Sequence, residues 1–172
     1  VTRAEAAAIL ARVALPDQRR EVVLMRDFAL KNTVTGERVF SIAVPQTSED
    51  AEGSYSTFYQ QGEQYLEVLV FFTQSEEYAG KDIVEICTAD EIAEAWGTAF
   101  GGCEYVTGVV QYGDTPAYLT TKLHPGEEDE CFFDDLVGID FAAGNLTVKV
   151  VINGAGCSGL FWQSVESVEL LG

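Results

Sequence analysis

The alternation between residues 146 and 153 is the feature that most constrains the fold of this chain. Apolar side chains recur there at every second position, namely Leu146, Val148, Val150 and Ile152. Successive side chains of a β-strand point to opposite faces of a sheet, so this spacing places the four on one face. Turn-forming residues bound the segment, with Gly144-Asn145 before it and a Gly-rich stretch at 153–159 after it. The pattern predicts a central strand, and the apolar run at 161–171 predicts another strand after the second turn.

Residues 64–73 carry the strongest signal of a buried strand. Both faces of such a strand are apolar, with Leu66, Val68, Val70 and Phe72 on one and Tyr65, Leu69 and Phe71 on the other. A strand with this composition is expected to be covered on both sides.

Shorter segments of the same kind recur along the chain. We expect a hairpin over residues 21–44 around a turn at 32–36, an acidic loop at 45–54, and strands at 82–88, 105–112, 117–123 and 131–133. Residues 89–100 fit either a short helix capped by Asp90 or the end of a strand. Strands at this density, without long helical patterns between them, predict an all-β fold, an antiparallel β-sandwich of jelly-roll-like type over residues 21–172.

A short α-helix is predicted before the sandwich, within residues 1–20. Thr2 can cap its first turn while Glu5 returns the bond, which is the capping-box arrangement. Alanines and the apolar residues Ile9, Leu10 and Val13 follow at helical spacing, and Pro16 ends the helix near residue 15.

The motif Thr2-Arg3-Ala4-Glu5, with the Ala-rich helix after it and Pro16-Asp17-Gln18-Arg19-Arg20 at its end, resembles the last helix of an S-layer homology (SLH) repeat. SLH domains are non-covalent anchors that hold exported bacterial proteins to cell-wall polysaccharides. The resemblance implies an extracellular protein associated with the cell wall or S-layer. It assigns Arg3 as a wall-polysaccharide contact and Glu5 as its structural companion. Only the end of one repeat is present, so wall binding is expected through the intact parent array.

The last third of the chain resembles jelly-roll carbohydrate-binding modules. The resemblance rests on Ile139-Asp140-Phe141-Ala142-Ala143-Gly144-Asn145-Leu146-Thr147-Val148, the glycine loop at 154–159, and Phe161-Trp162-Gln163-Ser164-Val165. It implies a glycan as the ligand. Many such modules place a calcium-binding aspartate on the final strand, where this chain has Gln163-Ser164.

The charge of the chain excludes two classes of partner. The net charge is −18, and Lys81, Lys122 and Lys149 are the only basic residues after position 38 apart from His124. Such a surface repels phosphate backbones and anionic lipids, so no nucleic acid is expected as a partner. No apolar run reaches 18 residues, so no membrane insertion is expected either. The chain begins without the features of a signal peptide, and we expect it to be a piece of a longer exported precursor.

An acidic cluster between residues 127 and 135 is the candidate metal site. Oxygen ligands for a structural calcium would come from Glu127, Asp129, Asp134 and Asp135. The spacing lacks the order of an EF-hand, and a solvated acidic loop is the alternative. No other cofactor is expected.

The four cysteines Cys87, Cys103, Cys131 and Cys157 allow three disulfide pairings, or four buried thiols, and the sequence does not choose among them.

Aromatic residues are the candidate ligand contacts. Aromatic rings stack on the apolar face of a sugar, and the candidates are Tyr112, Tyr118, Trp96 and Tyr105, with packing in the core as the alternative. His124 is the only histidine and stands in a His-Pro-Gly turn, so catalysis through it is not expected. The sequence predicts a non-catalytic module that binds a glycan. A structural or adhesive spacer that binds protein partners or no ligand is the alternative, and a glycoside hydrolase fragment is a third.

Overall fold

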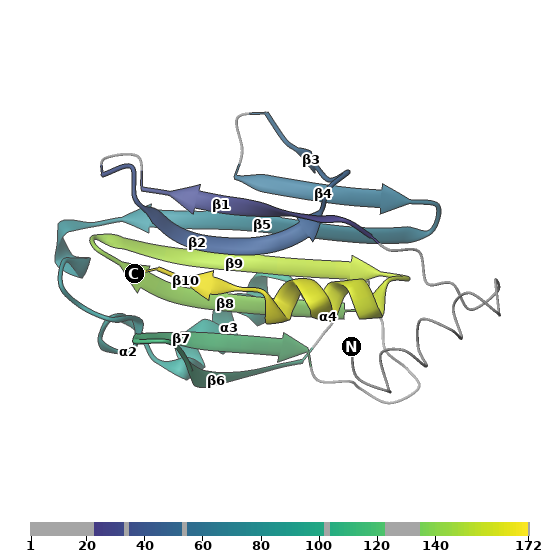
Figure 1. The fold of residues 1–172 in the computed structure, drawn as a ribbon. Coiled ribbons are helices and arrows are strands. Elements are labelled where there is room, and N and C mark those ends of the chain that lie inside the picture. The colour runs from purple at the N-terminus through teal and green to yellow at the C-terminus, as the bar shows by residue number, and fades with distance from the viewer. Residues whose placement is uncertain (1–22, 33–34, 53–54, 102–103, 123–134, 172) are drawn as a thin grey trace, which may run out of the picture.

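Two antiparallel sheets face each other in the computed structural model, which describes residues 23–32, 35–52, 55–101, 104–122 and 135–171 (Figure 1). The predicted antiparallel β-sandwich is therefore confirmed. The helix predicted within residues 1–20 lies outside the described residues.

The large sheet has seven strands in the order β3-β4-β5-β9-β8-β7-β6. Its strands are β3 (Glu49–Asp50), β4 (Ser56–Gln61), β5 (Gln64–Gln74), β6 (Tyr105–Tyr112), β7 (Thr115–Lys122), β8 (Asp135–Ala143) and β9 (Leu146–Ala155). The small sheet has the order β1-β2-β10 and consists of β1 (Met25–Lys31), β2 (Arg38–Pro45) and β10 (Glu169–Leu170). The predicted hairpin at 21–44 is the β1–β2 pair, and β3 begins within the segment predicted as an acidic loop.

The main core fills the space between the two sheets. The four alternating residues of β9 that the sequence singles out are all buried there, as predicted. Phe40 of β2 and Phe141 of β8 meet across this space, with their ring centroids 6.5 Å apart. The period of two in β9 is therefore the signature of one face turned to the small sheet.

Helices complete the fold on both sides of the large sheet (Figure 1). The helices α2 (Ile83–Ile86) and α3 (Ala89–Ala99) cover its outer face, and α4 (Ser158–Glu166) lies beside the small sheet against β2, β8 and β9. The molecule thus has three layers, with the large sheet in the middle. Across the described segments, no helix has the length and apolar character needed to cross a membrane.

Two segments predicted as strands are helical, and both predictions were wrong for physical reasons. Residues 83–86 form α2 because Asp82 accepts hydrogen bonds from the backbone N–H groups of Val84 and Glu85, while the Glu85 side chain accepts from the Asp82 N–H. The second segment, 161–171, lies mostly in α4, where residues at helical spacing face the core, namely Phe161, Ser164 and Val165, and only its end forms the strand β10. The ambiguous segment 89–100 is the helix α3, and its cap is Thr88 rather than Asp90.

Trp96 joins α3 to the large sheet by resting on a glycine. Its side chain is 1% exposed, and a Cβ added to Gly138 of β8 would lie 2.0 Å from the indole ring. Only a residue without a side chain leaves room for the ring at this place. The absence of a side chain on Gly138 therefore determines how closely α3 approaches the sheet.

Replacing Gly138 tests this packing. We expect Gly138→Ala to lower the free energy of unfolding by about 3 kcal/mol, because the rigid indole must move away from the new methyl group. The measurement is urea unfolding followed by tryptophan fluorescence. Gly108→Ala is the matched control, since Gly108 also lies in a strand and a Cβ there meets nothing within 4 Å. Equal effects of the two substitutions would contradict the packing argument.

Candidate functional site

A groove lies between the α2–α3 layer and the outer face of the large sheet. Its volume is about 360 Å³, within the usual range for ligand sites. It is lined by Phe71, Phe72, Thr73, Tyr78, Ile83, Ile86, Cys87, Ile92, Ala95, Asp140, Thr147, Val148 and Lys149. We call it the α2–α3 groove.

Three lining residues form a row across neighbouring strands. Phe71 of β5 lies directly opposite Lys149 of β9, and Lys149 lies directly opposite Asp140 of β8. Directly opposite residues of antiparallel strands have their Cβ atoms about 5 Å apart on the same face. The Phe71 side chain is 53% exposed, so the second face of β5 is covered only in part, contrary to the sequence prediction.

Asp140 is a buried carboxylate whose two oxygens are both engaged. The ammonium Nζ of Lys149 lies 3.0 Å from Oδ1, and the indole Nε1 of Trp96 donates to Oδ2 at 3.1 Å. The same ammonium lies 4.5 Å from the centroid of the Trp96 ring, which is a cation–π contact. A buried charge needs such partners to be tolerated, so these three side chains act as one unit.

Cys87 contributes a thiol to the groove at the end of α2. Burial raises the pKa of this thiol above its ordinary value, and the negative charges of Asp140 and Glu91 raise it further, while Lys149 lowers it. Only the thiolate is a strong nucleophile, so this raised pKa disfavours the reactive form of Cys87.

The structure separates the four aromatic residues predicted to contact a ligand. Trp96, Tyr105 and Tyr118 belong to the cluster under the helices, whereas Tyr112 packs on the opposite face of the sheet against the main core. The Tyr118 side chain is 4% exposed, and its hydroxyl donates to the carbonyl oxygen of Cys87 at 2.9 Å. Tyr105 donates in the same way to Phe100 at 2.8 Å. The four therefore do not lie together on one face of the sheet, and their role as ligand contacts stays a prediction.

The predicted metal and wall-polysaccharide residues are mostly outside the described residues. This holds for Arg3, Glu127, Asp129 and Asp134, while Asp135 is half-buried at the start of β8. Within the described ranges, no three His, Cys, Asp or Glu side chains are grouped so that they could hold a metal ion. The calcium site stays a prediction. Of the cysteines, Cys103 and Cys131 lie outside the described residues, and the buried Cys157 donates to the Tyr65 carbonyl oxygen at 2.9 Å.

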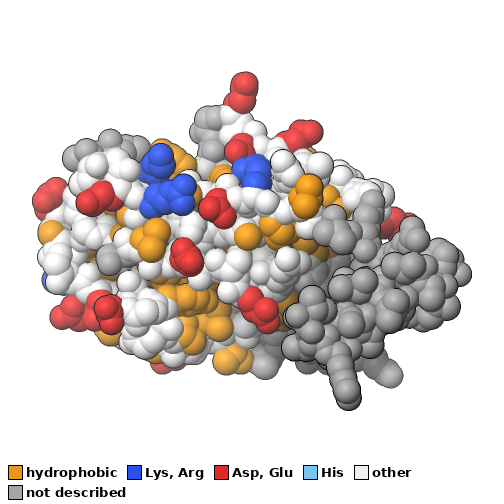
Figure 2. Space-filling view, viewed as in Figure 1, with side chains coloured by type: hydrophobic (Ala, Val, Ile, Leu, Met, Phe, Trp, Pro, Cys, Tyr) orange, Lys and Arg blue, Asp and Glu red, His pale blue; other side chains and the backbone are white. Residues whose placement is uncertain are grey.

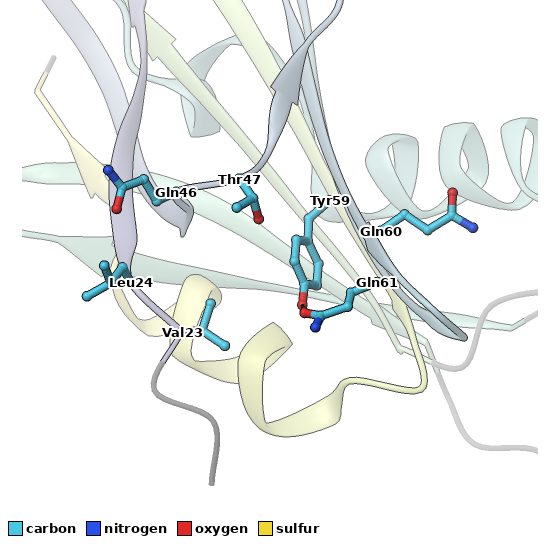
Figure 3. Close-up of a pocket in the computed structure, with 7 residues that line it drawn as sticks. All are labelled: Val23, Leu24, Gln46, Thr47, Tyr59, Gln60 and Gln61. Carbon is cyan, nitrogen blue, oxygen red and sulfur yellow. Dashed lines mark hydrogen bonds between the residues drawn. The ribbon is translucent and has the colours of Figure 1, made fainter.

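A second cavity of about 490 Å³ lies at one end of the sandwich (Figure 3). Its described lining is Val23, Leu24, Gln46, Thr47, Tyr59, Gln60 and Gln61, so it contains no charged side chain from that part of the chain. Figure 3 shows the Tyr59 hydroxyl beside Gln61, to which it donates at 2.6 Å, while Gln60 extends away from both. Because its tyrosine hydroxyl is already paired and no ionic group adjoins it, it is the weaker candidate.

Sequence reasoning missed Phe71, Lys149 and Asp140 as site residues. Lys149 could have been noticed in the sequence, since it is one of three lysines after residue 38 and the only charged residue of a mostly apolar strand. A cation at such a position needs a buried partner, and Asp140 in the preceding strand is the acid nearest in sequence.

The chain matches no family model, and no curated protein is similar to it in sequence. Among solved structures it is similar to the solution structure of cyanobacterial PsbP (CyanoP) from Synechocystis sp. PCC 6803, with a TM-score of 0.51 and 10% sequence identity. The match covers 88% of this chain and 95% of that chain. At this identity the likeness concerns the fold alone.

The comparisons correct the resemblances drawn from the sequence. The structural neighbour is a PsbP-like fold and not an SLH domain, and the absence of any family match leaves the SLH assignment without support, so it was wrong. The likeness to carbohydrate-binding jelly rolls fails at α4, because a helix stands where those modules have their final strand.

The thiol of Cys87 offers a direct test of the groove's environment. We expect the rate of its alkylation by iodoacetamide to reach half its maximum at a higher pH in the native protein than in urea, because burial and two carboxylates disfavour the thiolate. Mass spectrometry of the peptide containing Cys87 measures this separately from the alkylation of the other cysteines. Identical midpoints in the two states would contradict the assigned environment.

Proposed function

We propose that this chain is a non-catalytic binding domain whose ligand is a neutral glycan unit held in the α2–α3 groove. The observation that carries the proposal is the row of Phe71, Lys149 and Asp140 along the groove. Because glycans of this kind are displayed outside cells, an extracellular setting is part of the proposal.

The charge of the row favours a neutral ligand. Lys149 and Asp140 neutralise each other, so a ligand anion would compete with Asp140 and a ligand cation with Lys149. An ammonium has three N–H bonds, and a carboxylate accepts more than two hydrogen bonds. The pair can therefore donate to and accept from hydroxyl groups without any net charge on the ligand.

The aromatic ring beside the pair favours a ligand with an apolar face. Phe71 is exposed at the groove while its neighbours on the sheet hold the polar groups. A sugar ring has an apolar C–H face and a rim of hydroxyl groups, which match these two parts of the row. The groove's volume fits one or two sugar units.

Two observations support a role without catalysis. The raised pKa of Cys87 disfavours the nucleophilic thiolate form of the one thiol in the described lining of the groove. Glycoside hydrolysis needs two carboxyl groups, but Asp140 is the one carboxylate in the described lining of the groove. Both of its oxygens already pair with Lys149 and Trp96.

A protein partner is the second candidate. Phe71 and Phe72 at the groove and Val84 on α2 are exposed apolar residues within a strongly acidic chain. Exposed apolar groups that gather around a groove are typical of protein interaction sites.

A glycan array decides between the two candidates. We expect the purified chain to bind neutral glycans, and calorimetry on the strongest of them to show about tenfold weaker binding for Phe71→Ala, equal to about 1.4 kcal/mol. Lys149→Met should weaken binding similarly, because it removes the donors that face the ligand. Phe58→Ala is the matched control, since Phe58 is exposed on the adjacent strand and does not line the groove.

Two outcomes would reject the proposal. One is that no glycan binds, which would favour the protein partner. The other is equal loss in Phe71→Ala and Phe58→Ala, which would place the ligand elsewhere. Repeating the array with EDTA tests the predicted calcium site separately.

A further inference from the structure

The edge strand β6 is unusual among the sheet edges of this molecule. Its sequence, Tyr-Val-Thr-Gly-Val-Val-Gln-Tyr, contains eight residues with no charge and no proline. We propose that β6 is a docking site for an extended, cationic segment of a partner protein, which adds to the large sheet as a further strand. This proposal concerns a different surface from the α2–α3 groove and does not depend on it.

The other three edges carry the usual protection against strand addition. The opposite edge of the large sheet is β3, which has two residues, both acidic. In the small sheet, β10 has two residues, and β1 carries Arg26, Asp27 and Lys31. Short strands and charged side chains are how proteins blunt an exposed edge. Among the sheet edges of the described residues, β6 alone lacks both kinds of protection.

The backbone of residues 106–111 of β6 is available for pairing within the described part of the chain. Residues 106–111 make their backbone hydrogen bonds there in the ladder with β7. In an antiparallel edge strand, every second residue turns its N–H and C=O groups away from the sheet. Val106 and Val109 are 48% and 55% exposed, and they stand on opposite faces of the strand. An added strand would cover apolar groups on both faces while it completes the ladder.

The neighbouring face of the sheet extends this surface. Figure 1 shows β7 and β6 lying beyond the small sheet, and Figure 2 shows hydrophobic side chains gathered in that region. Val110, Tyr112 and Leu119 lie on this face and are only partly buried. A partner segment with alternating apolar residues would meet apolar groups there as well.

The charges at the two ends of β6 decide the kind of partner. Glu104 precedes the strand and Asp114 follows it, and both are exposed. If a second copy paired antiparallel with β6 over its full length, Glu104 of each copy would approach Asp114 of the other, and like charges would meet at both ends. The same two acids attract a segment that carries Lys or Arg at its ends. The net charge of −18 acts in the same direction at longer range.

A defined peptide tests the proposal. The probe is the fluorescein-labelled peptide Lys-Thr-Val-Thr-Val-Thr-Val-Lys, and its binding to the full chain is measured by fluorescence anisotropy. We expect saturable binding that weakens as salt is added, and protection of the β6 amides from hydrogen exchange. The double variant Val106→Lys/Val109→Lys should bind about tenfold more weakly, because lysines on both faces of the edge oppose strand addition.

The matched control adds the same charge elsewhere. Leu24→Lys/Trp162→Lys replaces two exposed apolar residues away from β6, so it should bind the peptide as the unaltered chain does. Equal loss in the two double variants, no protection of β6, or no binding at all would overturn the proposal. Sedimentation that shows a dimer lost in the β6 variant would also overturn it, in favour of a second copy. The variant Val106→Lys/Val109→Lys should still bind glycans, because neither residue lines the α2–α3 groove. A loss of peptide binding alone therefore tests β6 independently of the proposed function.

Discussion

The packing of α2 and α3 on the large sheet depends on the contact between the Trp96 indole and Gly138. The ring touches backbone where any side chain on Gly138 would exclude it, and its N–H satisfies one oxygen of the buried Asp140. Lys149 satisfies the other oxygen and covers the ring. If the indole left, Asp140 would lose a hydrogen-bond donor at a buried position, which is costly. The same indole therefore packs α3 onto the sheet and donates a hydrogen bond to the buried carboxylate. Removing it would affect both at once, and this keeps α3 on the outer face of the sheet.

This unit also sets the chemistry of the groove. The inner face of β9 is uniformly apolar, whereas its outer face places a cation between an aromatic ring and a carboxylate. Within a chain of net charge −18, a surface that is polar and yet locally neutral is uncommon. Because Asp140 of β8 and Trp96 of α3 hold the Lys149 ammonium in place, this donor would need little rearrangement to meet the proposed ligand.

The sequence predicted the sandwich well because alternation over a long strand admits one interpretation, and the buried residues of β9 and β5 follow it. It failed where local capping outweighs strand propensity, as at Asp82 before α2. It failed in α4 because Ser164, a polar residue, completes the buried face. The aromatic residues predicted as ligand contacts lie on different faces of the sheet for a geometric reason. In the β6–β7 hairpin, Tyr112 lies opposite Thr115 and Val109 opposite Tyr118, so Tyr112 and Tyr118 face opposite sides. The spacing of residues in the sequence does not reveal which residues of the two strands lie opposite each other.

The composition of β6 is best understood from what stability alone would require. Lysine or glutamate at the positions of Val106 and Val109 would cost the fold little, because these two residues are 48% and 55% exposed. Such charges would also remove the hazard of an open edge. The strand nevertheless has no charged residue, while Glu104 directly precedes it and Asp114 follows it after Gly113. That arrangement discourages pairing between copies and leaves the edge open to a segment of opposite charge, which is a property of recognition and not of folding.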